Sequence, residues 1–582
     1  LAIQKRYRDS IETVNRIAEQ KSLKEKEIKA RQLDSLKNAM LKDSNALAGM
    51  YGGFSSQAVG KESVVTLSNK DIKIDFSNKG AAIRQVELLK YKTDSRQPVK
   101  LLDDKNFDNF VRFKGGNLEV RTDEFFWQLV EQTKNSLTFR LYDGNSYIEY
   151  VYAIADSGFN VSQQIRTVGM ASKLDASKGM LMHWNTDLRL QEREAEVEKT
   201  KSTFYFKYFD EDADYISETS NEKLALENKT EWVSFKQQFF NTTIQAKDLF
   251  EKGSVIETAD PISAKNIKRL RAELKLPVKA GVDQQIELKY FFGPNQYQLL
   301  KDQNIGLDKI IPLGWGIFGW MNRFMIIPIF NFLQSYLSNY GIIILLLTLI
   351  IKTLLLPLVF KSYKSTAKMR LLKPEMDEIK EKHKDNMQQQ QLENLALYKK
   401  AGVNPLGGCL PMLLQMPILI AVFQFVPSAF EFRQQAFLWA DDLSIYDSIW
   451  TFGKLPIINS IYGDHVSLFT LLMTISTLIY TKMNNDLTAG VNEQMKYISY
   501  IMPILFLGFF NRYAAALTYY YFLSNVITFT QQWAIRKFVD ENKLRAQIHE
   551  SKSKNDGNAN KSAFQKRLEE MAKANQAYTK KK

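Results

Sequence analysis

The sequence predicts an α-helical membrane core of five transmembrane helices, joined to a large extracytoplasmic antiparallel β-sandwich and a cytoplasmic helical hairpin. Three observations predict this fold class. Long apolar runs begin only after position 310, roughly 230 residues before them alternate apolar and polar side chains, and the loops between the runs alternate in charge. With 582 residues, a net charge of +14 and 45% hydrophobic residues, the chain is neither wholly disordered nor wholly embedded in a membrane.

Residue types that build metal or disulfide sites are scarce in this chain. A single cysteine, Cys409, excludes a disulfide framework and any cysteine-based zinc site. The four histidines are scattered between positions 183 and 549, which disfavours a histidine metal cluster. We therefore expect neither a metal nor a cofactor. Because the chain begins at Leu1 and not at Met, the sequence leaves open a signal or first membrane segment upstream.

Residues 1–60 are predicted to form a charged helical linker, because charged, helix-prone residues dominate 19–43. Glycines and serines in 50–63 mark its boundary. From 61 to 300 we predict the antiparallel β-sandwich, with strands wherever apolar and polar residues alternate. These strands are 64–68, 71–77, 81–91, 117–122, 125–132, 136–143, 147–154, 159–168 and 284–293.

No motif of this β region indicates an active site. It contains no glycine-rich phosphate loop, no nucleophile elbow and no spaced pair of acids. The charged stretch 191–202 is expected to be an insertion. Trp127, Trp184 and Trp232 are interpreted as core residues, with a binding groove as the alternative.

Residues 301–338 are assigned to an amphipathic helix in the membrane interface. The segment 312–338 is apolar, yet polar side chains gather on one helical face, which favours lying in the interface over crossing the bilayer. Asn322 falls off that face. The polar face consists of Arg323, Asn331, Gln334, Ser335 and Ser338.

Five apolar runs follow and are predicted to cross the membrane within a core spanning 339–535. The first two approach the roughly 20 residues that a hydrocarbon core requires. The third and fourth are shorter, so buried or re-entrant helices are the alternative, and as spans they require a locally thinned bilayer. The runs are 341–360, 410–430, 466–481, 497–510 and 513–530.

The charges of the connecting segments set the orientation. Segment 361–405 holds ten Lys/Arg against six Asp/Glu, and the tail 536–582 holds thirteen against six, whereas segment 429–465 holds two against five. Because positive loops face the cytoplasm, 361–405 and the tail are predicted to be cytoplasmic and the β domain extracytoplasmic. Arg512, in a short outer loop, is the exception.

The two cytoplasmic segments carry their own predictions. Helical periodicity on both sides of 382–387 predicts a helical hairpin over 361–405, terminated by the glycines and proline of 401–408. The apolar positions of the hairpin form either its own seam or a docking face for apolar segments. The basic tail either binds RNA phosphate or anionic lipid, or is simply solvated.

Lys352 is the most informative residue. It lies about eleven residues into its run, which at ~1.5 Å per residue is roughly 16 Å, near the middle of the membrane. A charge there costs at least about 2.5–3.5 kcal/mol on insertion scales. None of the five runs contains Asp or Glu, so the ammonium must reach water, lose its proton, or meet an incoming carboxylate. We favour a hydrated cavity open to one side, with snorkelling as the alternative.

Other polar side chains at membrane depth can line the same cavity. Thr348 precedes Lys352 by four residues and therefore lies on the same helical face. The set contains no base–nucleophile pair and no buried acid, so we expect no enzyme chemistry. Each Ser or Thr can alternatively bond a backbone carbonyl or a neighbouring helix. The other members are Gln415, Gln424, Tyr519, Tyr520, Tyr521, Ser524, Asn525 and Thr528.

Several motifs in unbroken order within 338–537 resemble the YidC/Oxa/Alb family of membrane protein insertases. They are TLIIK at 348–352, AKMRLLKPEM at 367–376, NPLGGCLPMLLQMP at 404–417, FRQQAFLWADDLS at 432–444 and YYFLSNVITFTQQW at 520–533. The β region resembles, more weakly, the periplasmic domain of the Gram-negative bacterial members. The resemblance implies an insertase core over 339–535 and a first membrane helix before Leu1, six helices in all.

The resemblance also implies roles for particular residues. The groove cation of the family falls on Lys352, and the nearby groove threonine falls on Thr348. Many relatives carry Arg where this chain has Lys, which keeps the charge but lacks the bidentate guanidinium fork, so we expect a diffuse positive field to matter more than fixed geometry. The client-contacting segments of the family resemble LLQMP and YYFLSN, which implies client contacts at Gln415, Met416, Pro417, Tyr520, Tyr521 and Ser524.

The function implied is that of an inner-membrane insertase and folding chaperone. A client's polar flank would enter the hydrated, positively charged groove while its apolar segment slides into lipid. The expected partners are nascent membrane proteins and membrane lipids, with the Sec translocon and the ribosome as further candidates, and the protein is expected to be a monomer or weak oligomer. From the residues alone, two other classes stay open: a small-anion transporter or channel that uses Lys352, and a scaffold whose β domain binds partners.

Overall fold

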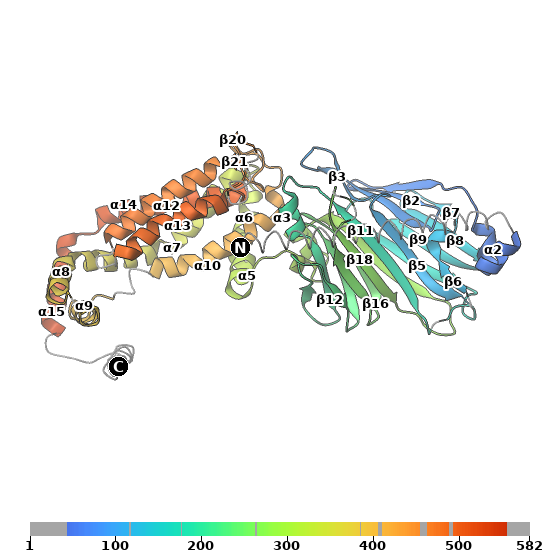
Figure 1. Ribbon diagram of the computed structural model, residues 1–582, viewed down its shortest axis with the longest axis horizontal. Helices are drawn as coiled ribbons and strands as arrows, with labels where there is room; N and C mark the ends of the chain where they lie inside the picture. The colour runs from blue at the N-terminus through green and yellow to red at the C-terminus, as the bar shows by residue number, and fades with distance from the viewer. Residues whose placement is uncertain are drawn as a thin grey trace, which may run out of the picture. The chain divides into compact units, whose positions relative to one another are not determined.

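The chain divides into two compact units between Ile310 and Ile311 (Figure 1). Strands build the first unit and helices build the second. The first 43 residues of the expected linker and residues 556–582 of the expected tail lie outside the described residues. The computed structural model describes residues 44–115, 118–175, 177–261, 263, 265–384, 386–404, 410–453, 462–487 and 493–555.

The first unit is an antiparallel β-sandwich, as predicted (Figure 1). In order across the nine-stranded sheet, the strands are β13 (Ala213–Tyr215), β12 (Thr203–Tyr208), β15 (Thr230–Lys236), β16 (Phe240–Phe250), β19 (Gln285–Pro294), β10 (Asn160–Val168), β9 (Ser146–Ile154), β8 (Ser136–Asp143) and β7 (Gln128–Gln132). The six-stranded sheet comprises β14 (Lys223–Ala225), β17 (Val255–Ala259), β18 (Asn266–Leu276), β11 (Met180–Arg189), β5 (Phe107–Gly115) and β6 (Leu118–Arg121). A four-stranded sheet comprises β1 (Val64–Ser68), β2 (Ile72–Ser77), β3 (Ala82–Lys92) and β4 (Pro98–Leu102).

Aromatic side chains fill the space between the sheets. The ring of Trp184 on β11 lies 5.4 Å from that of Tyr290 on β19, which joins the six-stranded sheet to the nine-stranded sheet. Trp127, Trp184 and Trp232 are 2%, 1% and 0% exposed. Their interpretation as core residues is therefore confirmed.

The strands located from the sequence pattern correspond to β1–β3, β6–β10 and β19, and all of them are confirmed. Several interior strands were not located, and β15 shows why. Six of its seven residues are buried, so both of its faces are covered. A strand with two covered faces loses the alternation on which the prediction rests.

The last part of the expected linker packs onto the β domain. It forms α2 (Ser44–Tyr51) and the 3₁₀ turn η1 (Gly52–Gln57). The rings of Tyr51 and Phe54 are buried and lie 5.1 and 5.7 Å from the ring of Phe125. These residues therefore belong to the core of the β domain.

Two short helices, α4 (Tyr297–Lys301) and η3 (Leu307–Ile310), end the first unit, and helices then dominate the second. The second unit contains α5 (Gly316–Met321), the π turn η4 (Asn322–Ile326), α6 (Ile327–Gln334), α7 (Tyr340–Leu371), α8 (Lys373–Lys382), α9 (Met387–Lys400), α10 (Leu410–Phe425), η6 (Val426–Ser428), η7 (Phe430–Phe432), the two-stranded β20 (Trp450–Thr451) and β21 (His465–Val466), α12 (Leu468–Leu487), α13 (Glu493–Phe510), α14 (Ala515–Phe538) and α15 (Glu541–Asn555). By length and composition, two described helices could cross a membrane, Gly316–Gln334 and Tyr340–Leu371. Shorter apolar helices cover Gln415–Ser428, Leu468–Met483 and Tyr497–Phe510.

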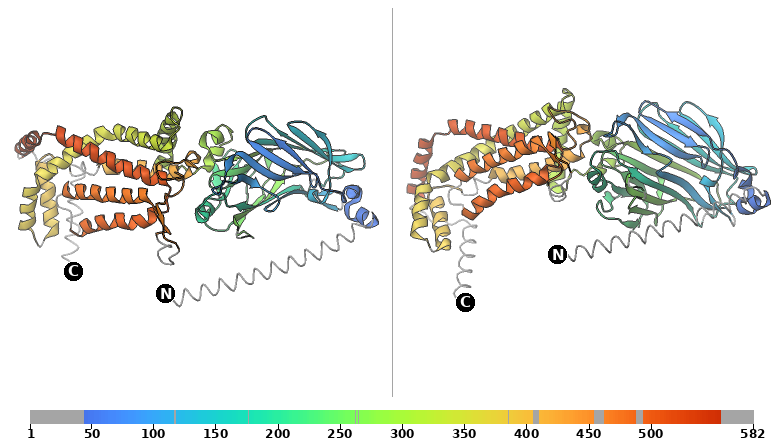
Figure 2. Two further views of the ribbon diagram at one scale, coloured as in Figure 1. Left: turned by 90° about the horizontal axis from the view of Figure 1, so that it is seen from above. Right: turned by 45° about the horizontal axis from the view of Figure 1, so that its top comes forward.

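The long helices of the second unit lie side by side (Figure 2). Helix α12 packs against both α13 and α14, and α7 packs against α14, α10 and α6. Helix α13 presents an apolar stripe in which Ile501, Leu505 and Phe509 are 52%, 65% and 50% exposed. Positions four residues apart share one helical face, so this stripe is a continuous apolar surface.

Helix α12 is capped from a distance by Asp447. This buried carboxylate accepts hydrogen bonds from the backbone N–H groups of Leu468 (2.8 Å) and Phe469 (3.0 Å) at the start of the helix. It also accepts from the indole of Trp439 (2.8 Å) and the hydroxyl of Ser467 (2.5 Å). A negative charge at a helix N-terminus satisfies otherwise unpaired N–H groups and the helix dipole.

Helices α8 and α9 pack against each other, and α15, from the first part of the predicted tail, packs against α7 and α9. Leu544 and Ile548 of α15 are buried in apolar clusters with residues of α7 and of the segment that follows α9. The Lys552 ammonium lies 2.6 Å from the Glu375 carboxylate of α8. The described part of the predicted tail therefore contains a packed helix, α15.

Candidate functional site

Lys352 lies inside the helical unit, on α7. Its side chain is 3% exposed, and its ammonium donates a 2.8 Å hydrogen bond to the hydroxyl of Thr528 on α14. The same hydroxyl donates to the carbonyl of Ser524 one turn earlier, at 2.7 Å. The buried ammonium of Lys352 therefore contacts the Thr528 hydroxyl directly, and the backbone of α14 holds that hydroxyl in place.

Two glutamines extend this contact into a polar line that joins three helices. The side-chain amide of Gln415 on α10 lies 3.3 Å from the hydroxyl of Ser524. The amide of Gln531 on α14 donates to the backbone carbonyl of Lys352 at 3.0 Å. Interhelical hydrogen bonds of this kind are a common way to hold helices together where water is scarce.

The charge of Lys352 has no acidic neighbour in the described part of the chain. Within those residues, no carboxylate oxygen lies within 4.0 Å of the ammonium. An ammonium carries three N–H donors, and the described residues accept only one of them. The other two donors have no hydrogen-bond acceptor among the described residues.

The structure brings together Lys352, Gln415 and Ser524 of the predicted site residues. Thr348 lies one turn from Lys352 and is fully buried, but its hydroxyl donates to the carbonyl of Ile344 at 2.6 Å. The hydroxyl of Thr348 is thus satisfied by its own helix. The hydrated groove stays a prediction, because Lys352 is buried among the described residues.

The remaining predicted residues lie on the same helices and make no hydrogen bond with Lys352 among the residues described. Tyr520 is 3% exposed and lies one turn before Ser524 on α14. The ring of Tyr521 is half-buried and lies 5.6 Å from that of Phe510. Met416 is 50% exposed, and the half-buried Pro417 follows it within α10. The side chain of Met416 therefore lies at the surface of the described helical unit.

Sequence reasoning undervalued three residues. Thr528 was expected only as one of several polar residues, yet it is the direct partner of Lys352. Gln531 was not expected, although its position three residues after Thr528 places it on the same helical face. The amide of Asn322 is buried and donates to the carbonyls of Leu313 (2.7 Å) and Ala421 (2.8 Å), which ties the start of the helical unit to α10.

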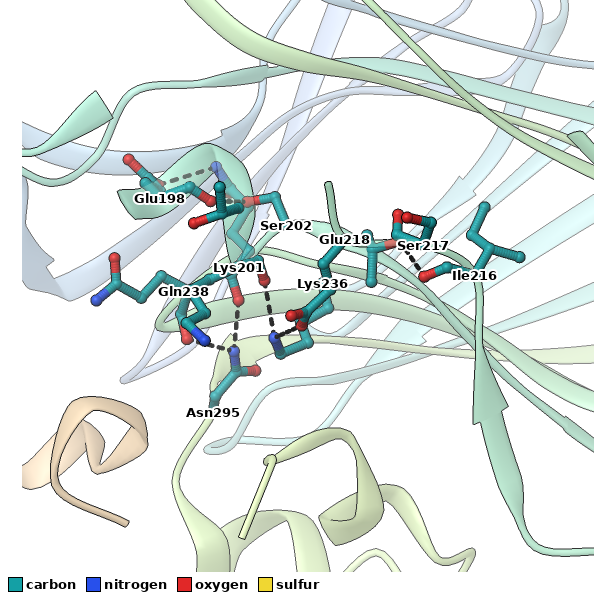
Figure 3. A network of polar contacts seen from close by, with 12 residues as sticks. Glu198, Lys201, Ser202, Ile216, Ser217, Glu218, Lys236, Gln238 and Asn295 are labelled. Atoms are coloured by element: carbon teal, nitrogen blue, oxygen red, sulfur yellow. Dashed lines mark hydrogen bonds and ion pairs between the residues drawn. The ribbon is translucent and has the colours of Figure 1, made fainter. Parts of the chain in front are cut away.

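A second group of buried polar side chains lies in the β domain (Figure 3). Lys236 of β15 and Lys268 of β18 are each 2% exposed, and they come from different sheets. The Lys236 ammonium donates to the carbonyl of Lys201 at 2.7 Å and lies 3.6 Å from the Glu218 carboxylate. The Lys268 ammonium donates to the carbonyls of Ser202 (2.7 Å) and Glu218 (2.8 Å). Both lysines therefore hold the same two connecting segments.

The stretch 191–202, expected to be a charged insertion, is anchored by a buried acid. It contains the short helix α3 (Ala195–Thr200), in which Glu198 is 1% exposed. The Glu198 carboxylate accepts from the backbone N–H groups of Gln191 (2.9 Å) and Glu192 (3.1 Å) and from the side chain of Gln237 (3.3 Å). Because backbone and amide N–H groups satisfy the Glu198 carboxylate, we assign this residue a structural role.

The two buried lysines make the stability of the β domain depend on pH. Burial lowers the pKa of Lys236 to about 8 and that of Lys268 to about 8, whereas both titrate near 10.5 in the unfolded chain. Between these values the unfolded chain binds more protons than the folded chain. The free energy of unfolding should therefore rise with pH across this window.

We expect the free energy of unfolding of wild type, relative to Lys236→Met, to rise by about 2 kcal/mol between about pH 7 and about pH 9.5. Pulse proteolysis of the β domain in the detergent-solubilised full chain measures the difference. The control variant is Lys252→Met, because Lys252 is exposed. The free energy of unfolding of wild type relative to this variant should show no such rise. A wild-type-to-variant difference that stays constant with pH would contradict the assignment.

Comparison with known proteins also finds two regions in the chain. A family model described as "60Kd inner membrane protein" matches residues 332–543, and one described as "YidC periplasmic domain" matches 64–328. A "Membrane protein insertase YidC" of Parabacteroides distasonis is 39% identical over 599 residues, covering 99% of this chain and 93% of the relative. One of Amoebophilus asiaticus is 36% identical over 563 residues, covering 94% and 93%. A crystal structure of an active YidC insertase aligns with a TM-score of 0.32 and 18% identity, covering 81% of this chain and 92% of that one.

Proposed function

The chain belongs to the YidC family of membrane protein insertases, and we propose that Lys352 is the charged centre of its client-binding groove. The observation that carries this proposal is a buried ammonium with no carboxylate within 4.0 Å among the described residues and with two N–H donors not taken by them. A client's acidic or polar flank can accept these donors. The other proposed groove residues are Thr348, Gln415, Met416, Pro417, Tyr520, Tyr521 and Ser524.

In the proposed mechanism, the client's polar flank enters the groove from the cytoplasm. The positive charge of Lys352 and the line of polar groups on α10 and α14 lower the cost of moving that flank away from bulk water. The client's apolar segment then passes into lipid along α10, where Met416 is exposed. No bond is made or broken, so the mechanism needs no catalytic group.

We propose that α7, α10, α12, α13 and α14 each cross the membrane. The alternating charge of the connecting segments supports this topology, which places the α8–α9 hairpin in the cytoplasm and the β domain in the periplasm. The exposed apolar stripe of α13 also supports a lipid-facing position for that short helix.

We propose that the helix Gly316–Gln334 lies in the outer interface, although its length and composition would also allow a crossing. The proposed topology requires this position, because the β domain precedes the helix and the start of α7 follows it on the same side. Exposed aromatic side chains support it, since tryptophan and tyrosine concentrate at membrane interfaces. Trp320, Phe324, Phe332 and Tyr336 are 58%, 67%, 61% and 76% exposed.

Reconstitution of the purified full chain with a short single-span client tests the proposed function. We expect proteoliposomes that contain the protein to protect the client's inserted segment from protease, whereas empty liposomes leave it accessible. Small-anion flux through the same proteoliposomes should match that of empty liposomes. Anion flux without client protection would instead favour a transporter.

We further propose that the basic tail contributes to ribosome docking. Truncation after Asn555 keeps the packed helix α15 and removes a segment with seven Lys/Arg against three Asp/Glu. Ribosome co-sedimentation should weaken, and its logarithmic salt dependence should flatten by about one unit or more, because fewer counterions are released from RNA phosphate. Unchanged binding with an unchanged salt slope would mean that the tail is only solvated.

A further inference from the structure

A cavity of about 460 Å³ lies in the β domain. Its walls are the β3–β4 loop, the turn before β5, the end of β11 and the start of β18. Eleven of the thirteen described lining residues carry a polar or charged side chain, which offers hydrogen-bond donors and acceptors to a ligand. The lining residues that carry the argument are Thr93, Lys100, Lys105, Arg189, Gln191 and Lys265.

The cavity is lined by four basic side chains, and none of its described lining residues is acidic. Arg189 pairs with Asp103 at 2.5 Å, and Lys100 donates to the neutral amide of Gln85 at 3.0 Å. Lys105 and Lys265 are exposed, and neither has a carboxylate within 4.0 Å in the ranges that the structure covers.

Two other carboxylates near the cavity are already paired with arginines outside its lining. Asp104 lies 3.0 Å from Arg84, although the charge of Lys105 also contributes to lowering the pKa of the Asp104 carboxyl, and Asp94 lies 3.2 Å from Arg193. The cations that face the cavity therefore exceed the carboxylates left to neutralise them. An anion would relieve their mutual repulsion.

Hydrogen bonds hold the walls of this cavity in place. Gln191 is 3% exposed, and its side chain donates to the carbonyl of Lys100 at 3.1 Å. The backbone carbonyl of Gln191 accepts a hydrogen bond from the backbone N–H of Asp94 (2.9 Å). The backbone N–H of Gln191 donates to the carboxylate of the buried Glu198 (2.9 Å). The pairing of β11 with β18 is irregular between Leu188 and Arg189, and such bulges re-aim side chains at strand ends. The basic groups are thus presented by a preorganised frame, which lowers the entropy lost on binding.

We propose that this cavity binds the phosphate ester of a small polar ligand. Lysine acts as a point charge for phosphate, and arginine offers planar N–H donors to its oxygens. The volume lies within the range of roughly 300–1,000 Å³ typical of ligand pockets. The same chemistry occurs on a phospholipid headgroup and on a soluble phosphate ester, and the proposal is independent of the insertase function.

Calorimetric titration of the full chain in phosphatidylcholine nanodiscs with sn-glycerol 3-phosphate tests the proposal. We expect saturable binding that weakens at least about tenfold in the double variant Lys105→Gln with Lys265→Gln, because it removes two cations that have no carboxylate within 4.0 Å among the described residues. The matched control is Lys178→Gln with Lys252→Gln, which removes two exposed lysines of the same domain outside the cavity lining. The absence of saturable binding, or an equal loss in both double variants, would overturn the proposal.

Competition then separates the two sources of the ligand. Displacement of sn-glycerol 3-phosphate by phosphatidylglycerol vesicles, but not by phosphatidylcholine vesicles, would identify a lipid headgroup. Retention of sn-glycerol 3-phosphate in the presence of both vesicles would identify a soluble phosphate ester. Either result supports a phosphate-ester site, because it presupposes binding that the cavity lysines control.

Discussion

Lys352→Met should lower client insertion by about tenfold or more, whereas Lys352→Arg should insert clients nearly as well as the wild type. The methionine variant removes the only positive charge of the α7–α10–α14 polar line and keeps an apolar side chain of similar length. Clients whose translocated flank carries Asp or Glu should lose a further few-fold in yield. That term is on the order of 1 kcal/mol, because a wet groove screens the pairing. Protease protection in proteoliposomes, normalised to folded protein, measures both effects.

Two threonines close to Lys352 provide a control variant and an intermediate variant for this experiment. Thr353 adjoins Lys352 on α7, is exposed, and donates its hydroxyl to the Leu349 carbonyl, so Thr353→Val should leave insertion unchanged. Thr528→Val removes the hydroxyl that accepts from Lys352 but keeps the charge, so its loss should be smaller than that of the methionine variant. Full activity of Lys352→Met on acidic clients would remove Lys352 from the mechanism.

Solvent access to position 352 tests the groove itself. Lys352→Cys in a Cys409→Ser background should react with a water-soluble maleimide added from the cytoplasmic side. The reaction requires water at the depth of Lys352, which the proposed mechanism also requires. An unreactive thiol in a folded variant would mean that the groove is dry.

Asp447→Ala should destabilise the helical unit by about 3 kcal/mol, because four donors lose their shared buried acceptor. Two of these donors are the backbone N–H groups of Leu468 and Phe469 at the start of α12. Since α12 packs against both α13 and α14, the loss should spread through the bundle. The thermal midpoint in detergent, measured by fluorescence-detected size exclusion, should fall by roughly 6–12 °C.

A graded series of variants distinguishes the cap from a general effect of charge. Asp447→Asn keeps one oxygen for the helix N–H groups and can donate its amide to the Ser467 hydroxyl, so its loss should be intermediate. The neighbouring Asp441 is exposed, and Asp441→Ala should leave the midpoint unchanged. Equal losses for Asp441→Ala and Asp447→Ala would show that the capping geometry is irrelevant.

Local pattern in the sequence was enough to divide this protein into its parts. The alternation over 64–77 predicts strands because one face of each is buried, and the apolar run 341–360 predicts a helix because its length suits a bilayer. The sequence also predicts that Lys352 has no acidic partner within the membrane, since no Asp or Glu occurs in any of the five apolar runs. These features depend on residues close together in the chain, so periodicity and composition report them directly.

The tertiary structure alone decided which distant residues meet. Thr528 contacts Lys352 across 176 positions, and Asp447 reaches the start of α12 from a separate loop. The buried Lys236 and Lys268 lie on strands where a lysine would be assigned to the surface, yet backbone carbonyls of other segments satisfy both ammonium groups. Such contacts arise from the complementarity of surfaces that fold together, and a helical or strand period carries no information about which surface lies opposite.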